Sequence, residues 1–154
     1  MKKYFFEITG KNYRGWAPFV LRLVIGFGFM AHGLAKLEKG PESFSHLLVQ
    51  LNIPFPLITA WISTTTELIG GLLLIVGLLT RIVTIPLIIT MLVALFGIHI
   101  HYGFSAVKTI GLTPQGPVFG PPGYEINLVY IAGLISILLL GAGRYSADNV
   151  VAKQ

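Results

Sequence analysis

The sequence contains no cysteine and little charge. Of its 154 residues, 11% are Asp, Glu, Lys or Arg, whereas 54% are hydrophobic. Without cysteine, the chain cannot form a disulfide relay, a thiolate zinc site or a cysteine-bound iron–sulfur cluster. A soluble domain usually carries about 25% charged residues. The low charge and the mean hydropathy of +0.78 therefore indicate a protein whose surface faces lipid.

The net charge is +5 and the isoelectric point is near 9.6. The basic residues are scattered singly beside apolar segments and do not form a cluster. This pattern is typical of charges that orient a membrane protein. We therefore expect the lipid bilayer as the main partner of the chain, and no nucleic acid.

Four apolar segments are long enough to cross a bilayer, which takes roughly 20 residues. They predict an all-α, integral membrane four-helix bundle that forms a single domain over residues 1–154. The predicted spans cover residues 16–37, 57–79, 82–102 and 125–143. The segment before the first span begins like a signal peptide, but Glu7, Lys11 and Arg14 interrupt it. We predict that it is an uncleaved segment at the membrane interface.

The Lys and Arg residues outside the span centres are divided unevenly between the two sides. One side would hold Lys2, Lys3, Lys11, Arg14, Arg81, Arg144 and Lys153, and the other would hold Lys36, Lys39 and Lys108. By the positive-inside rule, this bias predicts a multi-pass protein of the bacterial cytoplasmic (inner) membrane with both termini in the cytoplasm.

The two external loops predict different structures. The first loop, residues 38–56, carries Phe44, Leu47, Leu48 and Leu51 at helical spacing. This spacing predicts a short amphipathic helix at the outer interface. The second loop, residues 103–124, is rich in glycine and proline, and we predict a lid or an ordered coil across the outer mouth of the bundle.

Ionisable residues inside a membrane are costly, so each of them suggests a role. Arg22 and Lys36 share one stripe of the first span, and His32 lies at the edge of this stripe. Glycines on the same stripe would let a neighbouring helix approach closely. Glu67 lies near the middle of the second span, where a lone ionised carboxylate is unfavourable. We expect Glu67 to be protonated or to pair with Arg22, His32 or Lys36.

Further ionisable residues fall near the outer ends of the spans, at a depth similar to that of His32 and Lys36. His99 and His101 end the third span, and Glu125 begins the fourth. We predict a polar pocket in the outer half of the bundle, with Glu67 at its floor. Its candidate residues for substrate or quinone binding and for proton handling are Arg22, His32, Lys36, Glu67, His99, His101 and Glu125.

Some of these residues also have purely structural interpretations. Arg22 and Glu67 could form an ion pair that only fixes helix packing, and Lys36 could extend to the outer interface. Glu125 could simply favour a helix N-terminus. His99 and His101 are two residues apart, which on a continuous helix directs them about 200° apart. We therefore expect no metal site and no haem, and we leave the cofactor unassigned, with a quinone as the candidate.

Several short motifs resemble, in order and spacing, those of the DoxX family of small four-helix membrane proteins. The motifs are Arg22-Leu23-x-x-Gly26, His32-Gly33-x-x-Lys36, Glu67-x-x-Gly70-Gly71-x-Leu73, Gly77-Leu78-x-Thr80-Arg81, Gly123-Tyr124-Glu125 and Gly141-x-Gly143-Arg144-x-Ser146-x-Asp148. The resemblance covers about residues 22–148. It implies a four-helix fold and a link to oxidoreductases, because some relatives are subunits of thiosulfate:quinone oxidoreductase and others resemble membrane parts of redox-stress complexes.

Three functions are consistent with these features. The first is a membrane subunit of a quinone-linked or redox-stress oxidoreductase system, working with a partner subunit or as a homo-oligomer. In it, Lys36 and Arg22 would attract negative charge, while Glu67 and a histidine would move protons. The second is a proton-coupled small-molecule transporter. The third is a non-catalytic membrane anchor or assembly factor. The sequence does not decide whether the chain is an enzyme by itself.

Overall fold

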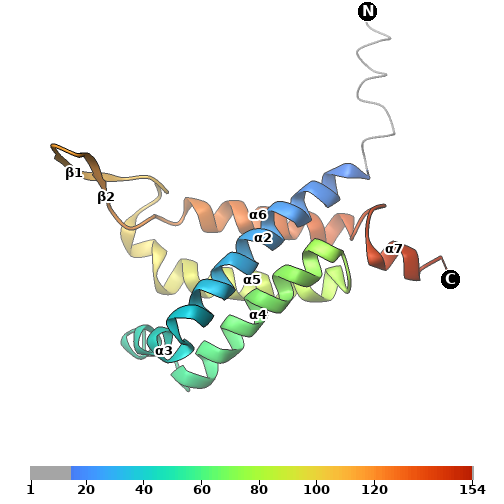
Figure 1. Cartoon of the computed structure of the whole chain (residues 1–154), viewed down its shortest axis with the longest axis horizontal. Coiled ribbons are helices and arrows are strands. Elements are labelled where there is room, and N and C mark those ends of the chain that lie inside the picture. Colours follow the sequence, from blue (N-terminus) through green and yellow to red (C-terminus); the bar gives the residue numbers. More distant parts are fainter. Residues whose placement is uncertain (1–14, 154) are drawn as a thin grey trace, which may run out of the picture.

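The structure is a computed structural model that describes residues 15–153. The predicted interfacial segment before the first span, with its basic residues, lies outside the described residues. Four helices form the bundle in Figure 1: α2 (Trp16–Lys39), α4 (Pro56–Val76), α5 (Thr80–Gly97) and α6 (Glu125–Leu140). This confirms the prediction of an all-α four-helix bundle.

The bundle helices have the length and composition of membrane spans. In the described part of the chain, α2, α4 and α5 are long and apolar enough to cross a membrane, and α6 is a shorter apolar helix. Each begins within two residues of its predicted start, but α5 ends early. It stops at Gly97, and the chain continues as a 3₁₀-helix, η2 (His99–Tyr102). Apolar side chains such as Val24, Phe27 and Leu139 are exposed on the outside of the bundle, as expected of surfaces that face lipid.

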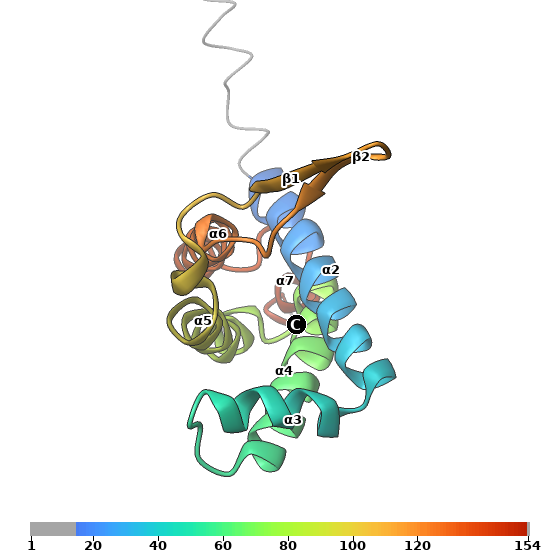
Figure 2. The same cartoon turned by 90° about the vertical axis from the view of Figure 1, so that its left-hand side faces the viewer.

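The bundle has two distinct ends, which lie at the left and the right of Figure 1, and Figure 2 views the bundle from the left-hand end. The α3 end holds α3 (Pro41–Gln50), η2 and the start of α6. The α7 end holds the start of α2, the turn between α4 and α5, and α7 (Ala147–Val151). Helix α3 is the short amphipathic helix predicted in the first loop. Its Leu48 is buried, and the helix packs along α4.

The glycine- and proline-rich loop contains a β-hairpin, which the sequence analysis did not predict. Strand β1 (Thr109–Thr113) pairs antiparallel with β2 (Gly116–Phe119), and the hairpin extends away from the bundle (Figure 1). The prediction of a coil lying across the mouth is therefore wrong for the middle of the loop. Its β-branched residues favour strands, and Gly116, with φ of 124°, supplies a backbone conformation that suits a turn.

Helices α2 and α4 approach each other closely through their glycines. A Cβ added to Gly26 would lie 2.7 Å from the carbonyl oxygen of Gly71, and one added to Gly71 would lie 2.5 Å from that of Gly26. The predicted glycine stripe of the first span therefore faces protein, as expected for closely packed membrane helices. The buried core of the bundle consists of Ile25, Phe29, Leu74, Val83, Leu87, Leu134 and Ile137.

Candidate functional site

A cavity of about 590 Å³ lies inside the bundle, toward the α3 end. Most of its wall is apolar and includes Phe44, Leu48 and Ile89. Its polar lining residues are His32, Lys36, Thr59, Ser63, Glu67, Thr90, His99, Asn127 and Tyr130. An apolar chamber with a few polar groups is the usual form of a site for a small organic ligand.

Lys36 and Glu67 form an ion pair in the wall of the cavity. Lys36 Nζ lies 2.7 Å from Glu67 Oε1, and it also donates a hydrogen bond of 3.1 Å to Ser63 Oγ. It lies 4.2 Å from the ring centroid of Phe44, within range of a cation–π interaction. The Glu67 side chain is 4% exposed. Lys36 is therefore the partner of Glu67, and the interpretation that it extends to the interface is wrong.

Two buried acceptors lie beside this pair without a hydrogen-bond partner. They are Glu67 Oε2 and Asn127 Oδ1, and both residues line the cavity. Asn127 is 2% exposed, and its Nδ2 lies 3.6 Å from Met91 Sδ. Buried polar atoms are nearly always paired, so these two atoms mark places where a ligand group can bind. The sequence analysis missed Asn127, although an asparagine within an apolar span was a signal that could have identified it.

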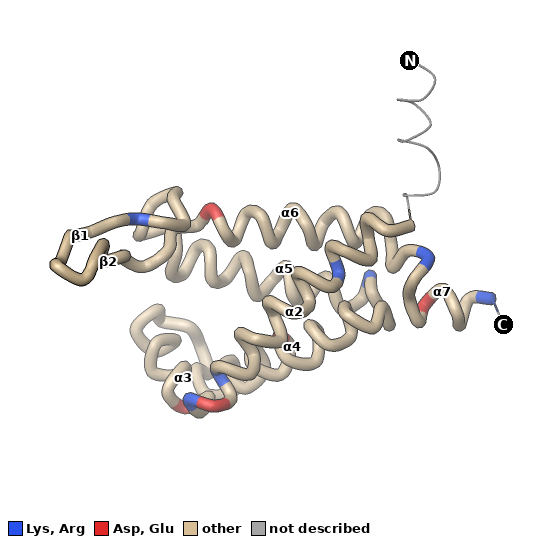
Figure 3. The backbone as a smooth tube through the Cα atoms, turned by 45° about the horizontal axis from the view of Figure 1, so that its top comes forward, with Lys and Arg blue, Asp and Glu red and all other residues tan. Residues whose placement is uncertain are grey.

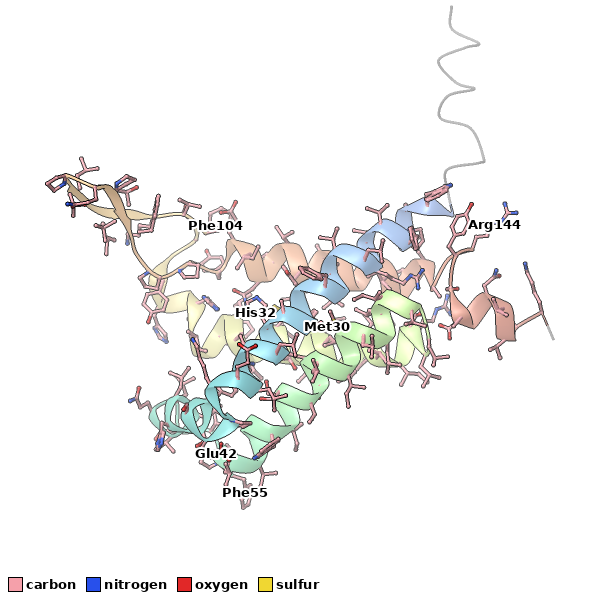
Figure 4. The ribbon with its side chains drawn as sticks, viewed as in Figure 1. Met30, His32, Glu42, Phe55, Phe104 and Arg144 are labelled. Carbon is pink, nitrogen blue, oxygen red and sulfur yellow. The ribbon has the colours of Figure 1, made fainter. Side chains whose placement is uncertain are left out.

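His99 and His32 complete the polar lining that was predicted. His99 Nδ1 lies 2.9 Å from the carbonyl oxygen of Pro122. A carbonyl oxygen only accepts hydrogen bonds, so Nδ1 carries the proton, and Nε2 of the neutral ring is an acceptor. His32 comes from α2, between Met30 and the α3 end, as Figure 4 shows. The structure therefore brings His32, Lys36, Glu67 and His99 to one cavity.

Arg22 does not lie in this cavity. It is fully buried near the α7 end, where its guanidinium donates a hydrogen bond of 3.3 Å to the carbonyl oxygen of Leu74 and another to that of Tyr145. Leu74 lies seven residues beyond Glu67 on α4, which is about 10 Å along the helix. The predicted Arg22–Glu67 ion pair is therefore wrong, because the antiparallel register of α2 and α4 places Arg22 too far from Glu67.

The remaining two predicted residues lie outside the cavity wall. His101 is exposed and lies in the 3₁₀-helix η2, which follows α5. Glu125, the first residue of α6, accepts a hydrogen bond of 2.9 Å at Oε2 from the amide of Ala106. Ala106 and Pro122 line the cavity. Glu125 thus holds in place a loop residue, Ala106, that lines the cavity.

A second polar cluster fastens the C-terminal tail to the α4–α5 turn. The carboxylate of Asp148 accepts hydrogen bonds from the amides of Leu79, at 2.7 Å, and Thr80, at 2.9 Å, at the start of α5. Burial raises the pKa of Asp148, but hydrogen bonds from Thr80 and Leu79 and the charge of Arg22 outweigh this effect and hold the pKa below its ordinary value. The C-terminal motif that ends at Asp148 therefore has a structural role, because Asp148 joins the tail to the turn between α4 and α5.

The fold and the cavity define a small integral membrane protein with an internal site among its spanning helices. The model of the DoxX family matches residues 17–100, which is more than half of the chain, so the protein belongs to the DoxX family.

The chain is also similar to several known bacterial proteins. An uncharacterized protein of Haemophilus influenzae is 30% identical over 143 residues, covering 90% of this chain and 85% of that protein. An uncharacterized membrane protein of Mycobacterium tuberculosis is 29% identical over 145 residues, covering 87% and 80%. CatD of Bacillus subtilis, provisionally named an oxidoreductase, is 32% identical over 85 residues, covering 55% and 61%. No solved structure gives a significant match.

Proposed function

We propose that the cavity binds a quinone and that the protein is a membrane subunit of a quinone-linked or redox-stress oxidoreductase system. One observation carries the proposal: a buried Lys36–Glu67 pair and an unpartnered Asn127 oxygen lie in the wall of a mainly apolar chamber of about 590 Å³. A quinone head group has matching chemistry, because it is a flat apolar ring with two polar oxygens on opposite sides.

The lining residues suit the proton half of quinone chemistry. Reduction of a quinone to a hydroquinone consumes two electrons and two protons. Glu67, His32 and His99 are lining groups that can exchange protons with a bound ring. The electrons would come from a partner subunit or from a reduced substrate of that partner. The similarity to CatD, whose provisional name describes an oxidoreductase, supports a redox system.

We also propose that the protein lies in the bacterial inner membrane with both termini in the cytoplasm. Arg81, Arg144 and Lys153 belong to the segments of the α7 end, whereas Lys36, Lys39 and Lys108 belong to those of the α3 end. Figure 3 shows basic residues at both ends of the bundle. Four more basic residues precede α2 in the sequence, and α2 begins at the α7 end. By the positive-inside rule, this bias favours a cytoplasmic α7 end, and the cavity then lies toward the outside.

Quinone binding is tested with the full-length protein in lipid nanodiscs. Equilibrium dialysis with decylubiquinone and with a short-chain menaquinone analogue should give saturable binding. Glu67→Gln and Asn127→Leu should weaken binding of the corresponding hydroquinone several-fold, because each variant replaces an unpartnered acceptor in the wall. Glu42→Gln is the matched control, because Glu42 is exposed on α3. Thermal unfolding of each variant would show that it is folded.

The alternatives make different predictions in the same assay. A proton-coupled transporter of another solute and a non-catalytic anchor both predict no saturable binding of either quinone. That result would overturn the proposal. A different result would be a bound quinone that is not reduced even after co-purifying proteins and candidate electron donors are added. That result would overturn the oxidoreductase role but not the proposed quinone-binding site.

A further inference from the structure

We propose that the cavity binds the reduced hydroquinone more tightly than the quinone. This inference rests on the proposed function and concerns the form of the ligand that the site prefers. It follows from the hydrogen bonds of the lining side chains, because the two buried lining atoms without a partner, Glu67 Oε2 and Asn127 Oδ1, are both acceptors.

The free acceptors come from three helical elements around the cavity. Glu67 Oε2 on α4 and Asn127 Oδ1 on α6 are buried and have no partner. Glu67 forms an ion pair with Lys36 through its other oxygen, and the carboxylate of such a pair only accepts hydrogen bonds. His99 on η2 adds its Nε2, because Nδ1 faces the carbonyl oxygen of Pro122.

Most donors in the wall are already used within the protein. The Lys36 ammonium donates to Glu67 and Ser63 and lies over the ring of Phe44. The hydroxyl of Thr59 donates to the carbonyl oxygen of Pro54, at 3.1 Å. The hydroxyl of Thr90 donates to the carbonyl oxygen of Pro86, at 3.0 Å.

Three lining side chains and one amide hydrogen are left as donors to a ligand. Ser63 accepts a hydrogen bond from Lys36, so the hydrogen of its own hydroxyl is left to donate. Tyr130 can donate through its hydroxyl, which lies against Gly28 on α2, and His32 can donate through its ring. The second hydrogen of the Asn127 amide completes the set.

A hydroquinone fits this wall better than a quinone does. Its two hydroxyl groups can donate to the free acceptors, whereas the two carbonyl oxygens of a quinone only accept. A bound quinone would leave Glu67 Oε2 and Asn127 Oδ1 shielded from water and unsatisfied. An unsatisfied buried acceptor is costly enough to change affinity about tenfold. For a two-electron couple, a tenfold preference raises the reduction potential of the bound ring by about 30 mV.

The decisive experiment compares three ligands of similar shape on the unaltered, full-length protein in nanodiscs. Decylubiquinol, decylubiquinone and the dimethyl ether of decylubiquinol are titrated under anaerobic conditions, with binding measured by calorimetry. The ether keeps both oxygens but cannot donate. We expect the hydroquinone to bind about tenfold more tightly than the other two ligands. Equal affinities for all three, or tighter binding of the quinone, would overturn the inference.

The Asn127→Leu variant assigns the preference to a particular atom. Leucine has the same branched side-chain outline as asparagine but lacks the acceptor, so hydroquinone affinity should fall several-fold while affinity for the ether changes little. An equal loss for both ligands would point to a change of cavity shape and contradict the role of Asn127 Oδ1. Quinone binding without a preference for the hydroquinone would defeat this inference alone. Absence of binding by all three ligands would defeat the proposed function as well.

Discussion

Lys36 on α2 and Glu67 on α4 meet where the two helix backbones are close together. One turn before Lys36, Gly33 packs so near to α4 that a Cβ on it would lie 2.6 Å from the amide nitrogen of Leu68, the residue after Glu67. This contact places the lysine stem beside the carboxylate, and the two side chains close to 2.7 Å. The small residue and the ion pair are therefore parts of one helix–helix contact.

Removal of the lysine charge should destabilise the protein more than removal of both charges. Lys36→Met leaves an unpaired carboxylate that is almost fully buried, and we expect a loss of about 3 kcal/mol in the free energy of unfolding. The double variant Lys36→Met, Glu67→Leu should recover much of this loss. Unfolding by sodium dodecyl sulfate in mixed micelles measures both values. Lys39→Met, an exposed lysine at the end of α2, should be close to neutral. Additive losses in the double variant would contradict the pairing.

Gly33→Ala should weaken the α2–α4 contact. The added methyl group would meet the backbone of Leu68, which cannot move aside as a flexible side chain can, and such overpacking costs about 2 kcal/mol. A lower thermal midpoint, together with weaker quinone binding, is the expected result. Gly111→Ala is the control, because a Cβ there has nothing within 4 Å. Equal midpoints for the two variants would mean that α2 and α4 are not in this register.

Arg22→Met should reduce stability without a change in quinone affinity. The guanidinium is fully buried and donates to carbonyl oxygens that join α2 to α4 and to the tail at Tyr145. Loss of a charged hydrogen-bond donor costs about 2 kcal/mol. Calorimetric titration with a quinone, run beside a thermal unfolding curve, separates the two effects. If Arg22→Met lost much of its quinone affinity while keeping normal stability, Arg22 would instead be a residue of the binding site.

The contact between Asp148 and the α4–α5 turn should make the stability depend on pH. Because the pKa of Asp148 is lower in the folded protein than its ordinary value, its contribution is fully present above the unfolded pKa of about 3.9. This contribution is lost as the pH falls through the lower folded pKa. Asp148→Asn should reduce the thermal midpoint at pH 7 and flatten its decline toward pH 3. If the thermal midpoints of the unaltered protein and of Asp148→Asn fell in parallel from pH 7 to pH 3, this prediction would be contradicted.

The proposed orientation can be tested because the natural chain contains no cysteine. Gln115→Cys places a single thiol in the turn between β1 and β2, and Lys153→Cys places one after α7. In intact bacterial cells, a membrane-impermeant maleimide should label the first variant and should label the second only after lysis. The reverse pattern would invert the proposed topology.

The sequence predicted features that depend on neighbours along the chain. The apolar runs predicted where each helix begins, and the spacing of Phe44, Leu47, Leu48 and Leu51 predicted α3. The glycine stripe of the first span correctly indicated a face in contact with another helix. These features are local, because a helix and its faces follow from the order of residues alone.

The tertiary structure decided how the polar residues are paired. Both Arg22 and Lys36 are on the stripe that faces α4, and only the register of the antiparallel helices places Lys36 beside Glu67 and Arg22 beside Leu74. The role of Asn127 likewise emerged only when α6 packed against the other helices and left its oxygen buried without a partner. Hydrogen bonds and ion pairs depend on distances of a few ångströms between residues far apart in the sequence, and only the packed helices fix these distances.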